Sequence, residues 1–224
     1  FRDYLDLRDD KRGIMGFSDH SESSGEMSRI FISDITFENE LTVVTRDGVG
    51  LDENKNTITG AKFDMEAVDT GAKGEFWIET VIRDGEDPGE VEQSINTILT
   101  GIDNGDIRIG GKKTRGFGRL HVIDVRRKIF DASNIFDYRY AYDNTFYSEN
   151  DILELSTNLS NKYVTIEVPL KIRGGISIRQ YQAKKGEPDY KHITANGKAV
   201  VPGTSFGGAI RSRTLAVAKE VLCE

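Results

Sequence analysis

Apolar, β-branched residues recur in short runs along the first third of the chain. A stretch rich in glycine and serine, residues 13–28, is too small and polar to pack and predicts a loop. From residue 30 to residue 44 a short apolar run is followed by rough alternation of apolar and polar positions. Because successive side chains of a strand point to opposite faces, this pattern predicts β-strands.

Residues 45–60 are dense in Gly, Asp, Asn and Thr, and they predict an exposed excursion in the form of an extended hairpin. Alternation returns at Phe63, Met65 and Ala67, and a β-prone run follows at residues 76–82. The glycines at positions 71 and 74 predict a tight turn that joins two further strands.

The period changes between Pro88 and Gly105, where apolar positions recur at spacings of three and four: Val91, Ile95, Ile98, Leu99 and Ile102. This spacing puts them on one face of a helix, which Asp87-Pro88 provides with a cap and a first-turn proline. A glycine-rich loop and a predicted strand at residues 120–125 come next. Several strands before one helix favour an α+β fold, with an antiparallel sheet and a helix on one face.

The composition changes again at residues 126–162, which start with basic residues and are then dense in Tyr, Asn and Asp. We expect a linker with at most one short helix. Alternating apolar positions from residue 163 to residue 172 predict the first strand of a new sheet. After a polar, basic loop at residues 177–198, a helix is predicted from Ala209 to Leu222, and its covering strands are expected from another segment or chain.

With 37% hydrophobic and 30% charged residues, the chain has a globular profile. No apolar run approaches the length of a membrane span, and the first ten residues lack the apolar core of a secretory signal. We therefore expect a cytoplasmic protein with no membrane partner. A single cysteine, Cys223, and three histidines are too few for a disulfide framework or a structural zinc site.

The formal net charge of −7 hides an uneven distribution. Residues 101–128 carry eight basic against three acidic side chains, and residues 171–213 carry nine against two. Two basic islands within an acidic chain suit a partner that carries phosphates. A solvated, functionless face is the alternative reading of such short charge runs.

The first island contains Gly110-Gly-Lys-Lys-Thr-Arg-Gly-Phe-Gly-Arg119. It is not a P-loop, because that motif requires Lys directly after its second glycine, and it is not a dinucleotide fingerprint, because a strand and not a helix is predicted after it. The glycines let the backbone approach a ligand, and the cations between them are candidate phosphate partners. A basic hairpin turn is the alternative.

The second island ends in Val201-Pro-Gly-Thr-Ser-Phe-Gly-Gly-Ala-Ile-Arg-Ser-Arg213. Small residues at the start of a helix leave backbone N–H groups open, and that geometry attracts anions. Arg211 and Arg213 lie within the first turns and could reach the same phosphates. A tightly packed helix entry is the alternative.

Together, the two motifs resemble the glycine-rich loop and the first-helix motif of the RAMP superfamily. Residues 28–34 and 63–76 resemble further parts of its pattern at the expected distances upstream. The resemblance implies ferredoxin-like, RRM-type domains. The glycine-rich loop normally ends such a domain and the other motif lies near its start. We therefore expect residues 1–128 to be the later part of one RAMP domain, 129–162 a linker and 163–224 the start of a second.

Proteins that this chain resembles form the backbone of type III CRISPR effectors, and the partners so implied are guide RNA, target RNA and other RAMP subunits or domains. A protruding hairpin in such proteins kinks the guide–target duplex, which would place Arg46 and Leu51 in a thumb, with Leu51 wedged between bases. The resemblance implies RNA contacts at Lys112, Lys113, Arg115, Gly116, Arg119, Arg173, Arg179, Thr204, Ser205, Arg211 and Arg213.

In backbone subunits that cleave RNA, an Asp before the first-helix motif promotes metal-dependent cleavage. Here Ile176 and Ser177 stand where that acid is expected, so Asp189 is the candidate catalytic residue, with Mg²⁺ or another divalent metal as the cofactor and no structurally bound cofactor expected. Two alternatives stay open. One is a non-catalytic capping subunit, and the other is a guide-processing endoribonuclease that uses a histidine at position 20, 121 or 192 as general acid–base.

Overall fold

The computed structural model describes residues 12–19, 24–38, 41–52, 56–155, 166–180, 186, 188 and 190–222. These residues fall into two compact units, one within Phe1–Asp34 and Phe76–Val164, the other within Ile35–Glu75 and Thr165–Glu224. Both consist of short antiparallel strand pairs and a few helices, so the predicted α+β class is confirmed.

The first unit begins with helix α2 (Arg12–Met15) and a hairpin of β1 (Phe17–Asp19) and β2 (Ser24–Glu26). The prediction of a plain loop for this glycine- and serine-rich stretch is therefore wrong. Small polar residues do not prevent backbone pairing, because ladder hydrogen bonds need no apolar side chain. The Arg29 N–H donates to the Ile14 carbonyl at 3.0 Å, and this bond holds the chain that leaves the hairpin against the end of α2.

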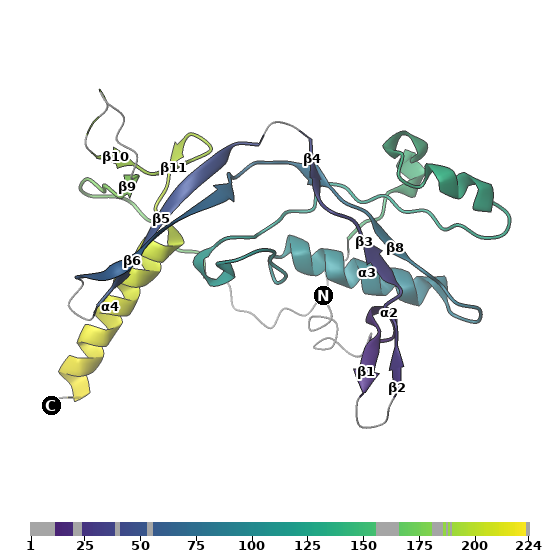
Figure 1. Cartoon of the computed structure of the whole chain (residues 1–224), viewed down its shortest axis with the longest axis horizontal. Coiled ribbons are helices and arrows are strands. Elements are labelled where there is room, and N and C mark those ends of the chain that lie inside the picture. The colour runs from purple at the N-terminus through teal and green to yellow at the C-terminus, as the bar shows by residue number, and fades with distance from the viewer. Residues whose placement is uncertain are drawn as a thin grey trace. The chain divides into compact units, whose positions relative to one another are not determined.

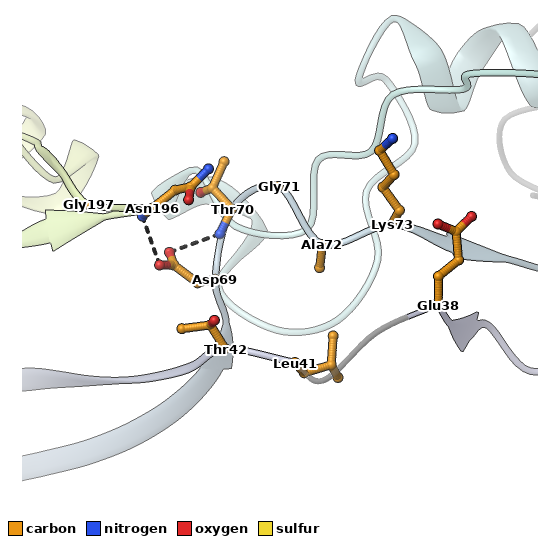
Figure 2. Close-up of a pocket in the computed structure, with 10 residues that line it drawn as sticks. All are labelled: Glu38, Leu41, Thr42, Asp69, Thr70, Gly71, Ala72, Lys73, Asn196 and Gly197. Atoms are coloured by element: carbon orange, nitrogen blue, oxygen red, sulfur yellow. Dashed lines mark hydrogen bonds between the residues drawn. The ribbon is translucent and has the colours of Figure 1, made fainter.

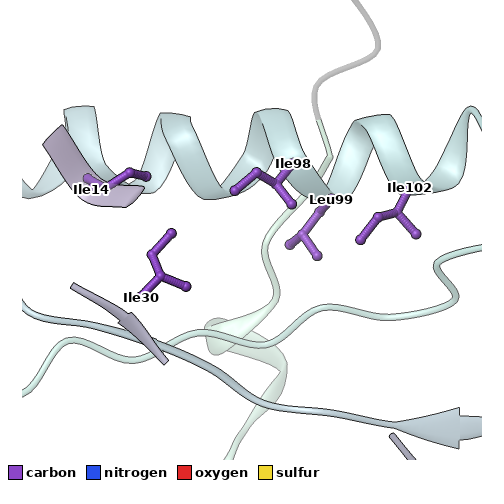
Figure 3. Close-up of a cluster of buried hydrophobic side chains, with 5 residues drawn as sticks. All are labelled: Ile14, Ile30, Ile98, Leu99 and Ile102. Atoms are coloured by element: carbon purple, nitrogen blue, oxygen red, sulfur yellow. The ribbon is translucent and has the colours of Figure 1, made fainter. Parts of the chain in front are cut away.

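Helix α3 (Pro88–Asp103) forms where the periodicity predicts it, and the Asp87 carboxylate caps it by accepting from the Gly89 N–H at 3.0 Å. Its apolar face lies against β3 (Ile30–Ile32), which pairs antiparallel with β8 (Ile78–Thr80) (Figure 1). Figure 3 shows the resulting core cluster, formed by Ile14, Ile30, Ile98, Leu99 and Ile102. Ile98 is fully buried, so this cluster holds the first unit together.

The strand predicted at residues 120–125 does not form, although Leu120, Val122 and Val125 do pack against the core cluster. The backbone N–H of Val122 donates to the carboxylate of Asp103 at 2.9 Å, not to a neighbouring strand. The apolar character of this segment is therefore used for packing, without a strand. Alternation could not indicate whether the backbone finds a ladder partner.

The expectation of at most one short helix in the predicted linker is wrong, because residues 129–155 contain three short 3₁₀ helices. These are η2 (Ile135–Tyr140), η3 (Asn144–Phe146) and η4 (Glu149–Asp151). Asp143 caps η3 by accepting from the Thr145 N–H, and Ser148 and Asp151 form a capping box on η4. Polar residues in the segment whose composition predicted a linker therefore cap its short helices.

In the second unit, β4 (Thr36–Phe37) pairs with β7 (Gly74–Glu75), and β5 (Val43–Leu51) pairs with β6 (Thr57–Val68) in the long hairpin that the sequence predicts (Figure 1). The ring of Phe63 lies over Gly48, its cross-strand partner, in the space that a side chain at position 48 would need. This ring therefore fills the surface gap that the glycine leaves.

The second unit continues with two short strand pairs and a helix. β9 (Arg179–Gln180) pairs with β10 (Lys191–His192), β11 (Thr194–Ala195) pairs with β12 (Lys198–Ala199), and α4 spans Gly203–Leu222. Of the strand predicted at residues 163–172, positions 163–165 lie outside the described residues. Positions 166–172 are exposed and irregular, so that prediction is wrong. α4 confirms the predicted helix, and none of its described side chains is buried.

We predict that Glu86→Gln lowers the melting temperature at pH 7 but not in acid. The nearly buried Arg29 guanidinium donates to the Glu86 carboxylate, and this bond holds the pKa of Glu86 below its ordinary value of 4.5. Because the pKa of Glu86 is lower in the folded state than in the unfolded state, ionised Glu86 stabilises the fold at every pH above the ordinary pKa of 4.5. This stabilisation is lost as the pH falls through the lowered, folded-state pKa. Thermal unfolding followed from pH 3 to pH 8 should show the two curves converging at the acid end. Glu154→Gln, at an exposed site, is the control, and a gap that persists at pH 3 would contradict the ion-pair explanation.

Candidate nucleic-acid interface

The glycine-rich motif of the first unit forms a loop that is closed at its base by a backbone hydrogen bond. The Ile109 N–H donates to the Gly118 carbonyl at 3.0 Å, and just before it the Ile107 N–H donates to the Gly101 carbonyl at 2.9 Å, at the end of α3. Gly118 has φ +75°, and a Cβ there would lie 1.9 Å from the Ile109 carbonyl oxygen. Only glycine fits at this closing position.

Within the loop, a single 3₁₀ turn, η1 (Lys113–Arg115), presents the cations to solvent. The Arg108 guanidinium holds this turn from behind: its Nη1 donates to the Lys113 carbonyl at 2.8 Å and its Nε to the Gly105 carbonyl at 3.2 Å. The sequence did not predict this role for Arg108. The only available indication was its position between Ile107 and Ile109, a charged residue between two apolar ones. The loop backbone is thus fixed by an arginine that faces the protein.

The predicted contact residues Lys112, Lys113, Arg115 and Gly116 are all exposed in this loop. Arg119, also exposed, runs beside Gly105 at the foot of the loop. The structure therefore brings these five predicted residues together on one short segment. Lys113 and Arg115 have no carboxylate partner within the described part of the chain, so their charges can meet a phosphate without first breaking an ion pair.

In the second unit, His192 ties the strand pairs to the entry of α4. Its Nδ1 accepts from the Ile178 N–H at 3.1 Å, and its Nε2 lies 3.1 Å from the Val200 carbonyl. Ile193, which is buried, adds backbone bonds to Ile178 and Val200. The predicted contact residue Arg179 lies in β9, with its guanidinium 4.7 Å from the centre of the Tyr190 ring.

At the start of α4, the Pro202 carbonyl accepts from the N–H groups of Ser205 and Phe206. The predicted residues Thr204, Ser205 and Arg211 are exposed in the first turns. Arg213 lies 3.9 Å from Glu220 in an exposed pair, an arrangement that contributes little to stability. Arg173 lies in the exposed, irregular segment before β9. Asp189, the candidate catalytic residue, lies outside the described residues.

Asp52 and Asn56 are bonded to each other where strands β5 and β6 end. The Asp52 carboxylate accepts from the Asn56 N–H at 2.8 Å, and the Asp52 N–H donates to the Asn56 carbonyl at 2.9 Å. Leu51, Val49 and Ile58, near this end of the strand pair, are each about half exposed. The predicted wedge residue therefore has apolar neighbours at the end of the paired strands.

At its other end, the hairpin is bound to the 191–200 segment. The Arg46 Nη2 donates to the Thr194 carbonyl at 2.9 Å, so the predicted thumb residue Arg46 also has a structural contact. Between these ends, Asp47 and Asp64 face each other across the strands. Partial burial, and then the Asp64 carboxylate, raise the pKa of Asp47. This like-charged pair would repel a phosphate, which leaves the tip as the part of the hairpin that suits nucleic acid.

Where the hairpin meets the β11–β12 turn, an open pocket of about 470 Å³ is lined largely by polar groups. Figure 2 shows Asp69 between its two backbone donors, the N–H groups of Thr70 and Asn196, each at 2.8 Å. Lys73 and Glu38 extend from the other side of the pocket. The Asp69 carboxylate is therefore occupied in joining the two segments.

A comparison with protein-family models identifies the family of this chain. The model of the RAMP superfamily matches residues 3–121, which is more than half of the chain. The chain belongs to the RAMP superfamily. The match spans the predicted glycine-rich loop in the first unit and the hairpin of β5 and β6 in the second. A search of the curated proteins found no match.

Membership of the RAMP superfamily implies a CRISPR-associated, RNA-binding function, and RAMP proteins work with CRISPR RNA in multi-subunit complexes. In the part of the RAMP chain that the structure describes, no helix has the length and apolar character needed to span a membrane. Because RAMP proteins bind RNA, RNA is the ligand against which the exposed loop of residues 109–118 should be tested.

We predict that Gly118→Ala disrupts this loop whereas Gly111→Ala does not. Alanine at position 118 would combine an unfavourable positive φ with overlap on the Ile109 carbonyl, and strain of this kind costs about 1–3 kcal/mol. At position 111 a Cβ meets no atom within 4 Å. Hydrogen exchange of the Ile109 amide and the melting temperature measure the effect. Equal protection of that amide in both variants would show that the closing bond does not depend on Gly118.

Proposed function

We propose that this RAMP protein is a guide-RNA-binding backbone component of a type III-like, RNA-targeting CRISPR effector. The observation that carries the proposal is the loop of residues 109–118, in which Arg108 and Gly118 fix the backbone while Lys113 and Arg115 extend without carboxylate partners among the described residues. A backbone held this way can follow a ribose-phosphate strand without reading its sequence, as expected where base pairing supplies specificity.

The hairpin tip supports the same proposal. Leu51 is half exposed next to the bonded pair Asp52 and Asn56, and an apolar side chain at the end of a paired hairpin suits insertion between bases. The two cationic groups lie in different compact units, and residues 35–75 belong to the same unit as residues 165–224. On the order of the two sequence motifs, we propose that residues 1–128 are the later part of one RAMP domain and residues 163–224 the start of a second. Binding by Arg173, Arg179, Thr204, Ser205, Arg211 and Arg213 belongs to this proposal.

We further propose that Asp189 takes part in metal-dependent cleavage of target RNA, on the sequence argument alone. Among the described residues, no three His, Cys, Asp or Glu side chains gather as a metal site, and Asp189 lies outside them. When bound, Mg²⁺ would supply charge stabilisation at the phosphate that is attacked.

For a histidine-dependent, guide-processing endoribonuclease, the geometry disfavours His192, because both of its ring nitrogens engage backbone groups. His121 bonds the Asp103 carboxylate through Nδ1 and is exposed, so it is the histidine that stays a candidate for this alternative. A general acid–base must reach the substrate through a ring nitrogen. His20 lies outside the described residues. The non-catalytic capping subunit stays as the alternative, favoured by Ile176 and Ser177 where an acid is expected.

We predict that the double variant Lys113→Glu and Arg115→Glu weakens guide-RNA binding and its dependence on salt. Each lost phosphate contact to single-stranded RNA should lower the slope of log K against log salt by about 0.7, so the two together should remove about 1.4. Filter binding between 50 and 300 mM salt measures this. Lys219→Glu, on α4 and outside both basic islands, is the control for charge alone. An equal loss in the control, or an unchanged slope, would contradict the proposed interface.

We predict that Asp189→Ala abolishes one cut in the target RNA when the complete effector is loaded with guide and supplied with Mg²⁺. End-labelled target RNA separated by length measures the products, and guide retention measured in parallel separates chemistry from binding. Glu187→Ala, an acid two positions earlier in the sequence, is the matched control. Products identical to those of the unmodified effector would dismiss Asp189 and favour the capping subunit.

A further inference from the structure

The three 3₁₀ helices η2, η3 and η4 organise an aromatic cluster that the RNA-binding proposal does not use. Trp77, next to β8, meets the rings of Tyr142 and Tyr147 at centroid distances of 5.5 and 5.8 Å. Phe146 stacks on Phe130 at 6.5 Å, and the Lys128 ammonium lies 3.9 Å from the centre of the Phe146 ring. These contacts give the segment a rigid base.

Two hydroxyl groups tie this segment to β8. Tyr138 and Tyr142 each donate to a different oxygen of the Glu79 carboxylate, both at 2.7 Å. These bonds raise the pKa of both tyrosines, with the carboxylate favouring the protonated phenol. The hydroxyls therefore stay protonated donors across the physiological range, and they fix the direction in which η2 presents its outer side chains.

On this base, η2 exposes two large apolar side chains. Phe136 is 84% exposed and Ile135 is 51% exposed. Three residues per turn put Phe136 and Arg139 on one side of a 3₁₀ helix, while Tyr138 turns back toward Glu79. An aromatic side chain this exposed, on a segment held in place by rings and hydroxyls, is typical of a residue that inserts into a partner.

The net charge of residues 129–155, the segment that carries Phe136, indicates which kind of partner can bind there. Residues 129–155 contain six carboxylates and one cation, Arg139: the acids are Asp131, Asp137, Asp143, Glu149, Asp151 and Glu154. Hydrogen bonds from Ser133 and Thr145 hold the pKa of Asp131 and of Asp143 below the ordinary value, so both carry charge at neutral pH. Arg139 itself lies over the Tyr140 ring, at 4.6 Å from its centre.

We propose that Phe136 and Ile135 form a protein-docking surface that inserts into an apolar pocket ringed by lysine and arginine on a partner protein. The net negative charge of the segment that carries them complements a basic surface and repels phosphate, so a protein partner suits these side chains better than RNA bases do, despite the ability of aromatic residues to stack on bases. This surface lies outside the basic loop of residues 109–118, and the proposal is independent of how that loop binds RNA.

The test places the photo-crosslinker benzoylphenylalanine at position 136 of the full-length protein, within the complex in which it is purified from its native host. Mass spectrometry then identifies the crosslinked molecule. The crosslinker at Ile123, which is 71% exposed on the same unit, is the matched control. We expect a crosslink from position 136, and not from position 123, to a peptide of another protein that carries at least two Lys or Arg residues within ten positions.

A second measurement addresses the binding energy. Phe136→Ala should lower the affinity of the chain for the rest of the complex by about 30-fold, the size expected for a central aromatic anchor, while Ile123→Ala should not. Crosslinking to RNA, to a second copy of this chain or to a peptide without basic residues would overturn the proposal. So would equal crosslinking from position 123, or an unchanged affinity with Phe136→Ala.

Discussion

The packing of α3 on the β3–β8 pair is the interaction on which the first unit depends. This packing buries Ile98 completely. The end of α3 supports the basic loop, and β8 supports the aromatic segment. At the end of α3, Gly101 accepts the backbone bond that starts the basic loop. On β8, Glu79 receives the two tyrosine hydroxyls that orient the aromatic segment. One apolar contact therefore positions both a cationic and an acidic surface.

The second unit is held differently. Among the described residues, Ile193 is its only buried hydrophobic side chain, and polar bonds carry most of the connections. Asp69 binds the Asn196 N–H, Arg46 binds the Thr194 carbonyl, and His192 joins β9 to the segment before α4. Such bonds are directional but individually modest, because each replaces a bond to water. The second unit is therefore held together by directional hydrogen bonds more than by the burial of apolar side chains.

Periodicity correctly predicted α3 and α4, the density of turn residues predicted the long hairpin, and the order of these elements predicted the α+β class, because each signal lies along one segment. It failed at residues 120–125 and 166–172, where a strand also needs a partner that the segment does not encode. It failed again at residues 129–155, where Asp143, Ser148 and Asp151 cap helices too short for a periodic pattern. The cations of the basic loop could be named from sequence, whereas Arg108 could not, because its role depends on the Lys113 carbonyl folding back onto it.

The Phe63 ring over Gly48 has a mechanical consequence. A two-stranded ribbon with a bare glycine in its middle would hinge there, and a load at its end would be absorbed by bending. With the ring filling that gap, we expect the ribbon to resist bending at this position. A force applied to the hairpin end would then be transmitted to the hydrogen bonds of Arg46 and Asp69 with residues 194 and 196.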